Sequence, residues 1–592
     1  MKKLSETIKY FIRILTILSG AGKVYLIIIV LLALFFGIIP SISVIVMQEI
    51  VNTLQMNSQN SSYLIILIAM YIAIDIFSGI LRMVSGYIEN VLQLKASVTL
   101  NMSVLEKVKE FSLKDFEDHE TYNLIQRANN IDISQLFNFF KSIILVLQSI
   151  INLTLFSLIL MSWRWWFLPV ISIVPIINIF VSVYFGKKQF LINKNRTDAG
   201  RKLWYFKYLL TNDMAFKEIS IFSLGDYFRS KYRQISLSFI RQDKNILNNK
   251  TGAQSTLFII DQIISSFLFT YVILKTFAGE LFLGNMNTYV RSISNVNSSL
   301  QSFLSQVNTI YQSALNIGQY FDFIDMKTQN TKCDNMIPLC EIPFIKIKNL
   351  SYKYKNQKKH ALNNINLRVD KGNIIAFIGQ NGSGKTTLIK ILSTLYNDFE
   401  GDVYFGNNNL RDLKPELVHK KIGLLFQDFI RYQLTVRENI ALGQLEKINN
   451  DSAIIQALSK TGMQEKIINL DEQLGFWFHG GIQLSGGEWL KIALSRAFIR
   501  DAEIYLLDEP NAALDAISEK KILDSFKELC EGKIGIIVSH RIASIKNIAN
   551  KIIVFDNGFI QAEGTHEYLL NNSDIYREMY NNEEGIEKLV NP

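Results

Sequence analysis

Cysteine is scarce in this chain. Its 592 residues contain three cysteines, Cys333, Cys340 and Cys530, and none of them lies in the first 332 residues. A disulfide framework and an N-terminal cysteine-protease domain are therefore excluded from that half. Cys333 and Cys340 lack the spacing of zinc ligands and have no histidine nearby, so we interpret them as incidental thiols on a linker. The length predicts several domains rather than one.

Charge is absent from several long stretches of the first half. Val24–Met47 has 24 residues without a charged side chain, enough to cross a bilayer as a helix. It is too long for a cleaved signal peptide, and similar stretches follow it. We predict six membrane-spanning helices, at about 24–47, 62–84, 142–162, 165–186, 251–274 and 288–320. The aromatic cluster Trp163–Trp166, between the third and fourth spans, predicts a turn at the level of the lipid headgroups.

The sixth predicted span is polar. Ser292–Phe321 has no charge, but it contains the amides Asn295, Asn297, Gln301, Gln306 and Asn308. Such a helix would be costly against lipid, so we predict that it faces a water-filled cavity.

Two carboxylates, Asp75 and Asp261, fall inside predicted spans. An ionisable residue within a membrane is a functional candidate by default. The structural alternative is that each carboxylate is the buried partner of a nearby serine or asparagine. A basic substrate would suit both of them, but the sequence does not place either one toward the cavity.

Basic residues predict the orientation in the membrane. The segment 187–250 has 14 Lys and Arg against 5 Asp and Glu, whereas the segment 48–61 has no Lys or Arg. The positive-inside rule therefore places both termini and the two long loops in the cytoplasm of a multi-pass plasma-membrane protein. The net charge of +9 for the whole chain equals the excess in that one loop, so we interpret it as a topology signal and expect no nucleic-acid partner.

The two long loops, about 85–141 and 187–250, show helical periodicity and almost no Gly or Pro. We predict that they are cytoplasmic continuations of the membrane helices. Their tips, near Lys114–Tyr122 and Thr211–Ile219, either dock on another domain or are solvated charged turns.

A change of composition marks the domain boundary. Residues 326–343 are polar and include two prolines, and from Phe344 onward strands and helices alternate without long apolar runs. We therefore predict an all-α transmembrane domain at 1–325, a linker at 326–343, a soluble α/β domain at 344–583 and a C-terminal tail at 584–592.

The second half contains a phosphate-binding loop. Gly379–Thr386 fits the pattern G-x-x-x-x-G-K-[ST], with an apolar β-prone stretch before it and a helical stretch after it. Glycines let backbone N–H groups surround phosphate oxygens, and the following helix directs its positive end at them. Lys385 would reach the β- and γ-phosphates and Thr386 would hold Mg²⁺. A glycine-rich turn with a chance lysine is the alternative, and the strand–loop–helix context argues against it.

Several polar side chains follow predicted strands. Asp508 and Glu509 end a buried strand, where Asp508 suits Mg²⁺ and Glu509 is placed to polarise the attacking water. Gln427 follows another strand and could bind Mg²⁺ and sense the γ-phosphate. His540 follows a third and could hydrogen-bond the γ-phosphate and the region of Glu509. The ring of Tyr354, in the first hairpin, could stack on a base.

A second anion site is predicted at Leu484-Ser-Gly-Gly-Glu488, because its glycines open a helix whose N-terminus attracts negative charge. With these stretches in place, residues 344–580 resemble the nucleotide-binding domain of an ABC transporter. The resemblance rests on Tyr354, the phosphate loop, Gln427, the signature 484–488, Asp508 and Glu509, Ala512-Ala-Leu-Asp515 and His540.

The resemblance implies a fold, an activity and a set of site residues. It implies a six-helix export-type membrane domain fused to an ABC ATPase domain, ATP hydrolysis coupled to transport, and ATP and Mg²⁺ as cofactors. ATP would lie between the phosphate loop of one chain and the signature of a second, so that a chain with one nucleotide domain would act as a homodimer or pair with a similar chain. The implied residues are Tyr354, Gly379, Gln380, Asn381, Gly382, Ser383, Gly384, Lys385, Thr386, Thr387 and Gln427 for ATP, Ser485, Gly486, Gly487 and Glu488 for ATP in trans, Thr386, Gln427 and Asp508 for the metal, Glu509 and His540 for catalysis, and Asp515 for communication across the dimer.

Two positions depart from the family pattern. Glu488 replaces the glutamine that usually ends the signature, and Ala512 stands where serine is common. The anion site of Ser485–Gly487 is kept, so we expect activity to survive. Ala512 is expected to weaken contacts at the dimer interface.

Further stretches resemble exporters of nisin-type lanthionine-containing peptides. They are 211–219, 426–429, 434–440, 473–477 and 483–489. The resemblance implies export of a ribosomally made, modified (lantibiotic-type) precursor peptide whose leader is removed elsewhere, with peptide-modifying enzymes as further partners. A multidrug or lipid exporter is the alternative, and an ATP-gated channel or regulatory subunit is a third reading that the intact Glu509 and His540 argue against.

Overall fold

The computed structural model describes residues 2–56, 61–118, 121, 124–125, 133–327, 341–355, 357–511 and 514–590. Contacts divide the chain into an N-terminal unit, Met1–Glu110 with Asp118–Lys327, and a C-terminal unit, Phe111–Glu117 with Thr328–Pro592. Most of the predicted linker, with Cys333 and Cys340, lies outside the described residues, and so does Ala512. Cys530 is buried in the C-terminal unit.

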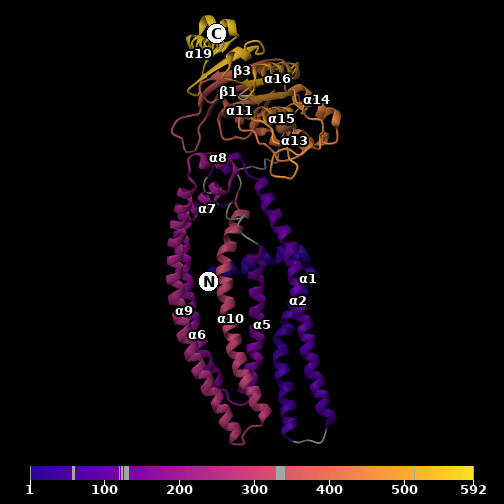
Figure 1. The fold of residues 1–592 in the computed structure, drawn as a ribbon, viewed down its shortest axis with the longest axis vertical. Coiled ribbons are helices and arrows are strands. Elements are labelled where there is room, and N and C mark those ends of the chain that lie inside the picture. Colours follow the sequence, from indigo (N-terminus) through magenta and orange to yellow (C-terminus); the bar gives the residue numbers. More distant parts are fainter. Residues whose placement is uncertain are drawn as a thin grey trace. The chain divides into compact units, whose positions relative to one another are not determined.

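The described part of the N-terminal unit is built from helices only (Figure 1). Its helices are α1 Lys2–Gln55, α2 Ser61–Lys109, α5 Ile133–Met161, α6 Phe167–Asn195, α7 Thr197–Thr211, α8 Asp213–Ile221, α9 Gly225–Phe277 and α10 Leu283–Ile324. Gly22, with an extended backbone at φ 172°, breaks α1 into an N-terminal piece and a membrane-spanning piece.

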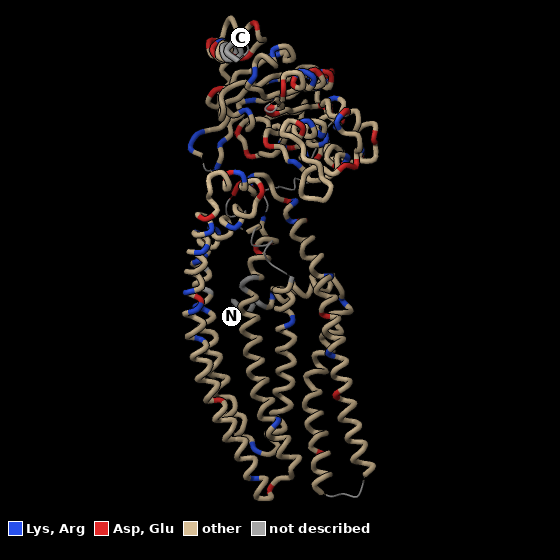
Figure 2. The backbone as a smooth tube through the Cα atoms, viewed as in Figure 1, with Lys and Arg blue, Asp and Glu red and all other residues tan. Residues whose placement is uncertain are grey.

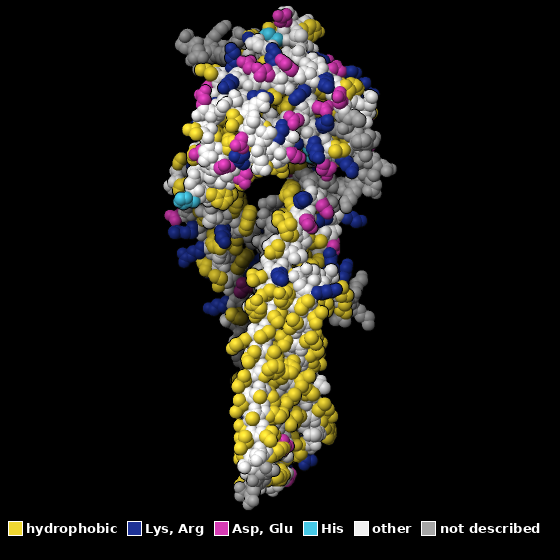
Figure 3. All heavy atoms as spheres, turned by 90° about the vertical axis from the view of Figure 1, so that its right-hand side faces the viewer, with side chains coloured by type: hydrophobic (Ala, Val, Ile, Leu, Met, Phe, Trp, Pro, Cys, Tyr) yellow, Lys and Arg dark blue, Asp and Glu magenta, His cyan; other side chains and the backbone are white. Residues whose placement is uncertain are grey.

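Five of these helices, α1, α2, α5, α6 and α9, are long and apolar enough to cross a membrane, judged over the residues that the structure describes. On the side of the molecule that Figure 3 shows, hydrophobic side chains cover most of the helical part. A helix surface of this kind suits lipid rather than water. The polar α10 is not among the five, and it packs against α5, α1 and α6. Its assignment as the sixth span stays a prediction.

The turn predicted at Trp163–Trp166 joins α5 to α6. Two of its indoles pack inside the unit: Trp163 stacks on Tyr289 at 4.7 Å between ring centroids, and Trp166 meets Tyr271 edge-on at 5.4 Å. Trp165 alone is strongly exposed, at 71%. Most of this aromatic cluster therefore ties the turn to α9 and α10, and only Trp165 is free to lie among headgroups.

The prediction that the long loops continue the membrane helices is confirmed. α2 runs unbroken to Lys109, and α6 to α9 fill the segment 187–250. Lys and Arg gather on the parts of these helices outside the apolar stretches (Figure 2). The tip near Thr211–Ile219 forms α8, capped by Asn212, whose side chain accepts the backbone N–H of Met214 at 2.9 Å. Met214 and Phe216 are 86% and 66% exposed, so docking of this tip stays a prediction.

The other tip is part of the C-terminal unit. The segment Phe111–Glu117, which includes α3 Leu113–Glu117, contacts this unit rather than its neighbours in sequence. The buried Tyr396 hydroxyl donates to Glu117 Oε1 at 2.6 Å, and Lys114 pairs with Asp398. Docking is thus confirmed for this segment; the remainder of the tip lies partly outside the described residues.

Two sheets form the C-terminal unit. Their strands are β1 Phe344–Tyr352, β2 Leu362–Asp370, β3 Ile374–Gly379, β4 Glu400–Phe405, β5 Asn408–Asn409, β6 Ile422–Leu425, β7 Ile504–Asp508, β8 Ile534–Val538, β9 Lys551–Asp556 and β10 Phe559–Gly564. The first sheet is antiparallel, in the order β2-β1-β4-β5. The second has the order β10-β9-β3-β8-β7-β6 and is parallel from β9 to β6.

Helices cover the parallel sheet because its strands are apolar on both faces. On β7, Ile504 and Leu506 belong to one apolar core and Tyr505 and Leu507 to another, as the alternation of side chains along a strand requires. The helices are α11 Lys385–Leu392, α12 Pro415–Lys420, α13 Val436–Ala441, α14 Asp451–Thr461, α15 Gly486–Phe498, α16 Ala516–Leu529, α17 Ile542–Ile545, α18 His566–Asn572 and α19 Asp574–Val590, with short 3₁₀ turns at Leu410–Asp412 and Leu445–Lys447. A third core, around the fully buried Trp489, joins α13, α14 and α15.

Candidate functional site

The phosphate loop lies between β3 and α11, as predicted. Gly384 has φ +107°, and a Cβ there would lie 2.5 Å from the carbonyl oxygen of Ala361, so only glycine fits. The buried Lys385 turns back into the loop, where its Nζ donates to the Gly379 and Gln380 carbonyls at 2.8 and 2.9 Å. Burial lowers the pKa of Lys385, and the nearby Glu509 and Asp508 carboxylates oppose that shift. The loop therefore holds its own cation at the place where phosphate oxygens are expected.

The order of the parallel strands explains why distant residues meet. Because the carboxyl ends of parallel strands share one edge of the sheet, residues that follow β6, β7 and β8 become neighbours there. Gln427 follows β6, Glu509 follows β7 and His540 follows β8. Gln427 Nε2 donates to Glu509 Oε2 at 2.8 Å, and His540 Nε2 lies 2.6 Å from Glu509 Oε1. The structure thus brings these three predicted residues together.

Glu509 has an unusual backbone. Its φ is +53°, a left-handed conformation that is rare for residues other than glycine. Strain of this kind persists only where the surroundings fix the residue. Contacts to both carboxylate oxygens fix this side chain, and 15% of it remains exposed. It is a rigid and accessible carboxylate.

The metal predicted at Thr386, Gln427 and Asp508 fits an orphaned group in the structure. Asp508 is fully buried, and neither carboxylate oxygen accepts a hydrogen bond from the described residues. Burial raises the pKa of the Asp508 carboxyl, and the nearby Thr386 side chain opposes the rise. A buried carboxylate without donors is costly unless a cation compensates it. A hard divalent cation that prefers oxygen ligands suits this set.

A cleft of about 1060 Å³ opens over the phosphate loop. Its predicted lining residues are Tyr354, Asn381, Gly382, Ser383, Gly384, Lys385, Thr386, Thr387, Gln427 and Glu509. The Tyr354 hydroxyl lies 3.1 Å from Thr387 Oγ1, which holds the tyrosine at the edge of the loop. His540 reaches Glu509 but is not among the lining residues.

The cleft also has lining residues that sequence reasoning missed. They are Gln357, Lys359, His360, Ala361, Asn363, Asn557 and Phe559. The basic, polar run that follows Tyr354 in the same hairpin could have indicated Gln357, Lys359 and His360. Asn557 lies in the turn between β9 and β10, and Phe559 begins β10. Nothing in the sequence around them pointed to phosphate or base binding.

The signature lies elsewhere on the unit. Ser485 caps α15: its Oγ accepts the Glu488 N–H at 3.4 Å, and Glu488 Oε2 accepts the Ser485 N–H at 2.8 Å. Lys466 also pairs with Glu488 and, through this hydrogen bond, lowers the pKa of the Glu488 carboxyl. Neither Ser485 nor Gly486 lines the cleft, and both are exposed. One chain alone does not bring signature and phosphate loop together.

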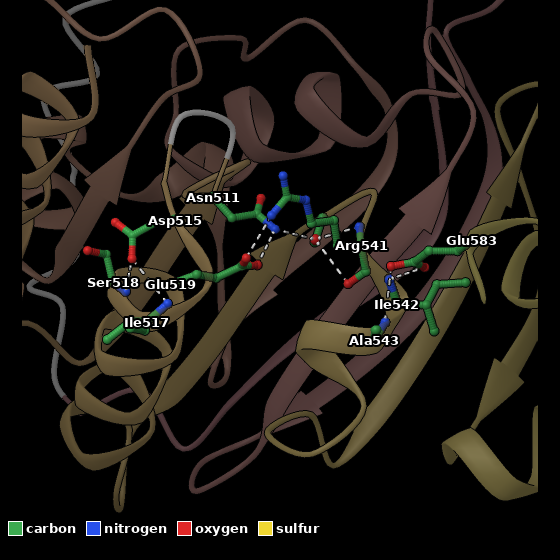
Figure 4. Close-up of polar contacts among 10 residues, drawn as sticks. Asn511, Asp515, Ile517, Ser518, Glu519, Arg541, Ile542, Ala543 and Glu583 are labelled. Carbon is green, nitrogen blue, oxygen red and sulfur yellow. Dashed lines mark hydrogen bonds and ion pairs between the residues drawn. The ribbon is translucent and has the colours of Figure 1, made fainter. Parts of the chain in front are cut away.

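A polar network centred on the buried Glu519 and Asn511 holds the loops that follow β7 and β8 (Figure 4). Glu519, on α16, accepts from Asn511 Nδ2 at 2.7 Å and pairs with Arg541 Nη1 at 2.8 Å. Asn511 follows Glu509 by two residues and Arg541 follows His540 directly, so Glu519 links the two loops that carry the catalytic candidates. No motif in the sequence predicted this link. The predicted Asp515 caps α16 by accepting two backbone N–H groups at 2.9 and 3.1 Å.

Comparisons with known proteins agree with this site and this fold. A family model described as ABC transporter matches residues 362–512. The chain is 35% identical over 561 residues to the subtilin transport ATP-binding protein of Bacillus subtilis, covering 94% of this chain and 90% of that protein. It is 34% identical over 568 residues to the nisin transport ATP-binding protein of Lactococcus lactis subsp. lactis, covering 95% and 94%.

A solved structure of a bacterial Atm1-family ABC exporter with ATP bound superimposes with a TM-score of 0.77 at 18% identity, over 96% of this chain and 98% of that one. This likeness confirms the predicted fold class, a helical exporter-type membrane domain followed by an α/β ATPase domain. The family, and its coupling of ATP hydrolysis to transport, are established by the two transport proteins that match nearly the whole chain at 35% and 34% identity. The chain therefore belongs to the ABC transporter family and carries its membrane part and its nucleotide-binding part in one polypeptide.

Proposed function

We propose that this protein exports a modified, lantibiotic-type precursor peptide across the cytoplasmic membrane, driven by ATP. The observation that carries the proposal is the similarity to the subtilin and nisin transport proteins, which spans the helical unit as well as the ATPase unit. The ATPase motifs are shared by transporters of many substrates, whereas the membrane half is where a substrate is recognised. Likeness there therefore bears on the substrate class.

The proposed roles in the cleft follow from the geometry. Lys385 exchanges its bonds to loop carbonyls for oxygens of the β- and γ-phosphates, while Tyr354 supports the base. Magnesium, when bound, neutralises charge on the phosphate oxygens. Thr386, Gln427 and Asp508 are the residues that would hold it.

Glu509 is proposed as the general base. Its carboxylate takes a proton from water, the water oxygen bonds to the γ-phosphorus, and the bond to the β–γ bridging oxygen breaks. ADP leaves with that electron pair. Gln427 and His540 orient Glu509 from both sides, and His540 is also proposed to donate to the γ-phosphate.

The complete ATP site is proposed to form between two copies of the chain. Ser485 and Gly486 are exposed and separate from the cleft of their own chain, which leaves the Ser485 hydroxyl and the Gly486 N–H for the γ-phosphate on a partner. Gly487 completes this anion site, and Glu488 is proposed to hold it in place through its two hydrogen bonds with Ser485. Asp515 is proposed to contact the partner near it. Binding of ATP would then close the dimer, and hydrolysis would release it.

Both termini and the ATPase unit are proposed to be cytoplasmic, because the basic segments flank the apolar helices on that side. Under this orientation, precursor-modifying enzymes are proposed as cytoplasmic partners. The substrate would enter from the cytoplasm and leave on the opposite side after the nucleotide-driven closure.

Reconstitution tests the proposal. Inside-out proteoliposomes of the purified protein are supplied with ATP and with one of three probes: the lanthionine-bridged precursor of nisin with its leader, a fluorescent cationic dye, or a labelled phospholipid. We expect ATP-dependent accumulation of the precursor, above that of the dye and the lipid. Accumulation of the dye or lipid alone would identify a drug or lipid exporter, and passive ion flux without coupled hydrolysis would identify a channel.

The contact of Glu117 with Tyr396 provides a test of coupling. Glu117→Ala leaves the buried Tyr396 hydroxyl without its acceptor, at a cost of about 1–3 kcal/mol. We expect ATP-driven transport to fall by on the order of tenfold while ATP hydrolysis changes by less than about threefold. Transport and hydrolysis are measured on the same proteoliposomes.

The matched variant is Glu117→Ala combined with Tyr396→Phe, which removes the stranded hydroxyl as well. Replacing both partners of a hydrogen bond is far milder than removing one, so we expect part of the transport to return. Unchanged transport in Glu117→Ala would show that this contact does not transmit closure.

A further inference from the structure

A cavity of about 390 Å³ lies between α9 and α10. Serine and amide side chains make up much of its lining, and the rings of Phe258 and Phe269 complete one part of it. It lies on the helix that the sequence predicted to be cavity-facing: Asn297 and Gln301, two of the five amides singled out there, line it. The cavity belongs wholly to the N-terminal unit and is distinct from the nucleotide cleft.

Asp261 is the charged residue of this cavity. It is 4% exposed, and one of its oxygens, Oδ2, accepts from Asn297 Nδ2 at 2.6 Å and from Gln301 Nε2 at 3.4 Å. Gln301 Nε2 also donates to Asn297 Oδ1 at 3.2 Å, which ties the two amides together. The described residues give Oδ1 no hydrogen-bond donor. The carboxylate is thus held in place by one oxygen, while the other has no hydrogen-bond partner among the described residues.

No cation compensates this carboxylate within the described part of the chain. None of the residues that line the cavity is a lysine or an arginine, and Asp261 takes part in no ion pair there. It lies 16 residues before the end of α9 at Phe277, or roughly 24 Å along the helix, which is within the thickness of a bilayer core. An ionised carboxylate at this depth is costly without a positive partner.

The volume and the lining residues of the cavity indicate which kind of cation it can bind. Its volume is many times that of a single metal ion, and no group of three or more His, Cys, Asp or Glu able to hold a metal occurs among the described residues. An aliphatic stem can pack against the phenylalanine rings, and a cation can lie over their faces. An ammonium or guanidinium group on a hydrocarbon chain satisfies all three features: charge, volume and apolar lining.

We propose that the cavity between α9 and α10 is a recognition subsite in which Asp261 binds a lysine or arginine side chain of the exported peptide. The proposal rests on the proposed function, in that the ligand is taken to be a peptide in transit. Asn297 and Gln301 are positioning residues, since they orient the carboxylate and do not neutralise it. Asp75, the other carboxylate of the predicted spans, is exposed and does not line this cavity.

A pair of probe peptides tests this subsite without requiring ATP turnover. The protein is placed in nanodiscs, and binding is measured for a fluorescent peptide with one lysine and for the same peptide with acetyl-lysine, which is neutral and of similar shape. We expect the wild type to favour the lysine peptide on the order of tenfold, the range of a hydrogen bond to a charged group. Asp261→Asn is expected to reduce this ratio to about one, whereas Asp261→Glu keeps a preference.

Asp75→Asn is the matched control, since it removes the other intramembrane carboxylate and is expected to leave the ratio unchanged. A purely structural Asp261 would lower the yield of folded protein in Asp261→Asn but would not change the ratio in what remains. The proposal is overturned if the wild type does not distinguish the peptides or if Asp261→Asn keeps the preference. Failure of the export proposal would appear separately, as absence of ATP-driven accumulation in vesicles despite lysine-selective binding.

Discussion

Replacing Glu509 with glutamine is expected to lower ATP hydrolysis by about 10²–10⁴-fold while ATP still binds. Glutamine has the shape of glutamate but cannot take a proton from water. The contacts to Gln427 and His540 keep that side chain in place, so the loss should fall on the chemical step rather than on binding. Phosphate release and equilibrium binding of a fluorescent ATP analogue measure the two quantities.

Glu528→Gln is the matched control, because Glu528 is exposed on α16 and undergoes the same chemical change outside the cleft. It should hydrolyse ATP at the wild-type rate. Wild-type hydrolysis in Glu509→Gln would remove Glu509 from the role of base. Loss of ATP binding in that variant would instead assign Glu509 a part in holding the nucleotide.

Two inactive variants are expected to restore each other when they are mixed. Lys385→Met removes the cation from the phosphate loop, and Gly486→Asp adds a negative charge to the anion site of the signature. If the ATP site combines the loop of one chain with the signature of the other, a mixed dimer keeps one intact site of two. Half of randomly formed dimers are mixed, so hydrolysis should recover to at most about one quarter of the wild type.

The structure makes Gly486 suitable for this experiment. A Cβ at this position meets no atom within 4 Å, so the substitution changes charge without a clash. Gly486→Ala, with bulk but no charge, should lose much less activity. Co-expression with two different affinity tags isolates the mixed dimer. Mixed dimers as inactive as either parent, or a single chain that hydrolyses ATP at the full rate, would contradict a shared site.

The sequence predicted the parts of the site that depend on local order. The phosphate loop, the residues that end β6, β7 and β8, and the helix that starts at the signature each follow from a short stretch read with its neighbours. The meeting of Gln427, Glu509 and His540 also follows, since parallel strands place their carboxyl ends at one edge.

The features that were not predicted depend on contacts between surfaces that are far apart in the sequence. From the sequence alone, Glu519 is expected to be an ordinary carboxylate on a helix surface. Only the packing of α16 against the loops shows that it bridges Asn511 and Arg541. Asp261 could be placed in a span, but its contact with Asn297, 36 residues away, depends on the rotation of two helices. The indoles near Trp163 were predicted to lie among headgroups. Two of them instead pack inside the unit, against aromatic rings on α9 and α10.

The docked segment Phe111–Glu117 has a consequence for biosynthesis. Glu117 leaves the ribosome 279 residues before the tyrosine that it binds. At about 5–20 residues per second, roughly 15–60 seconds of translation separate the two partners. The membrane helices are therefore made well before the surface that completes this contact exists, and the second unit becomes whole only by receiving a piece of chain synthesised with the first.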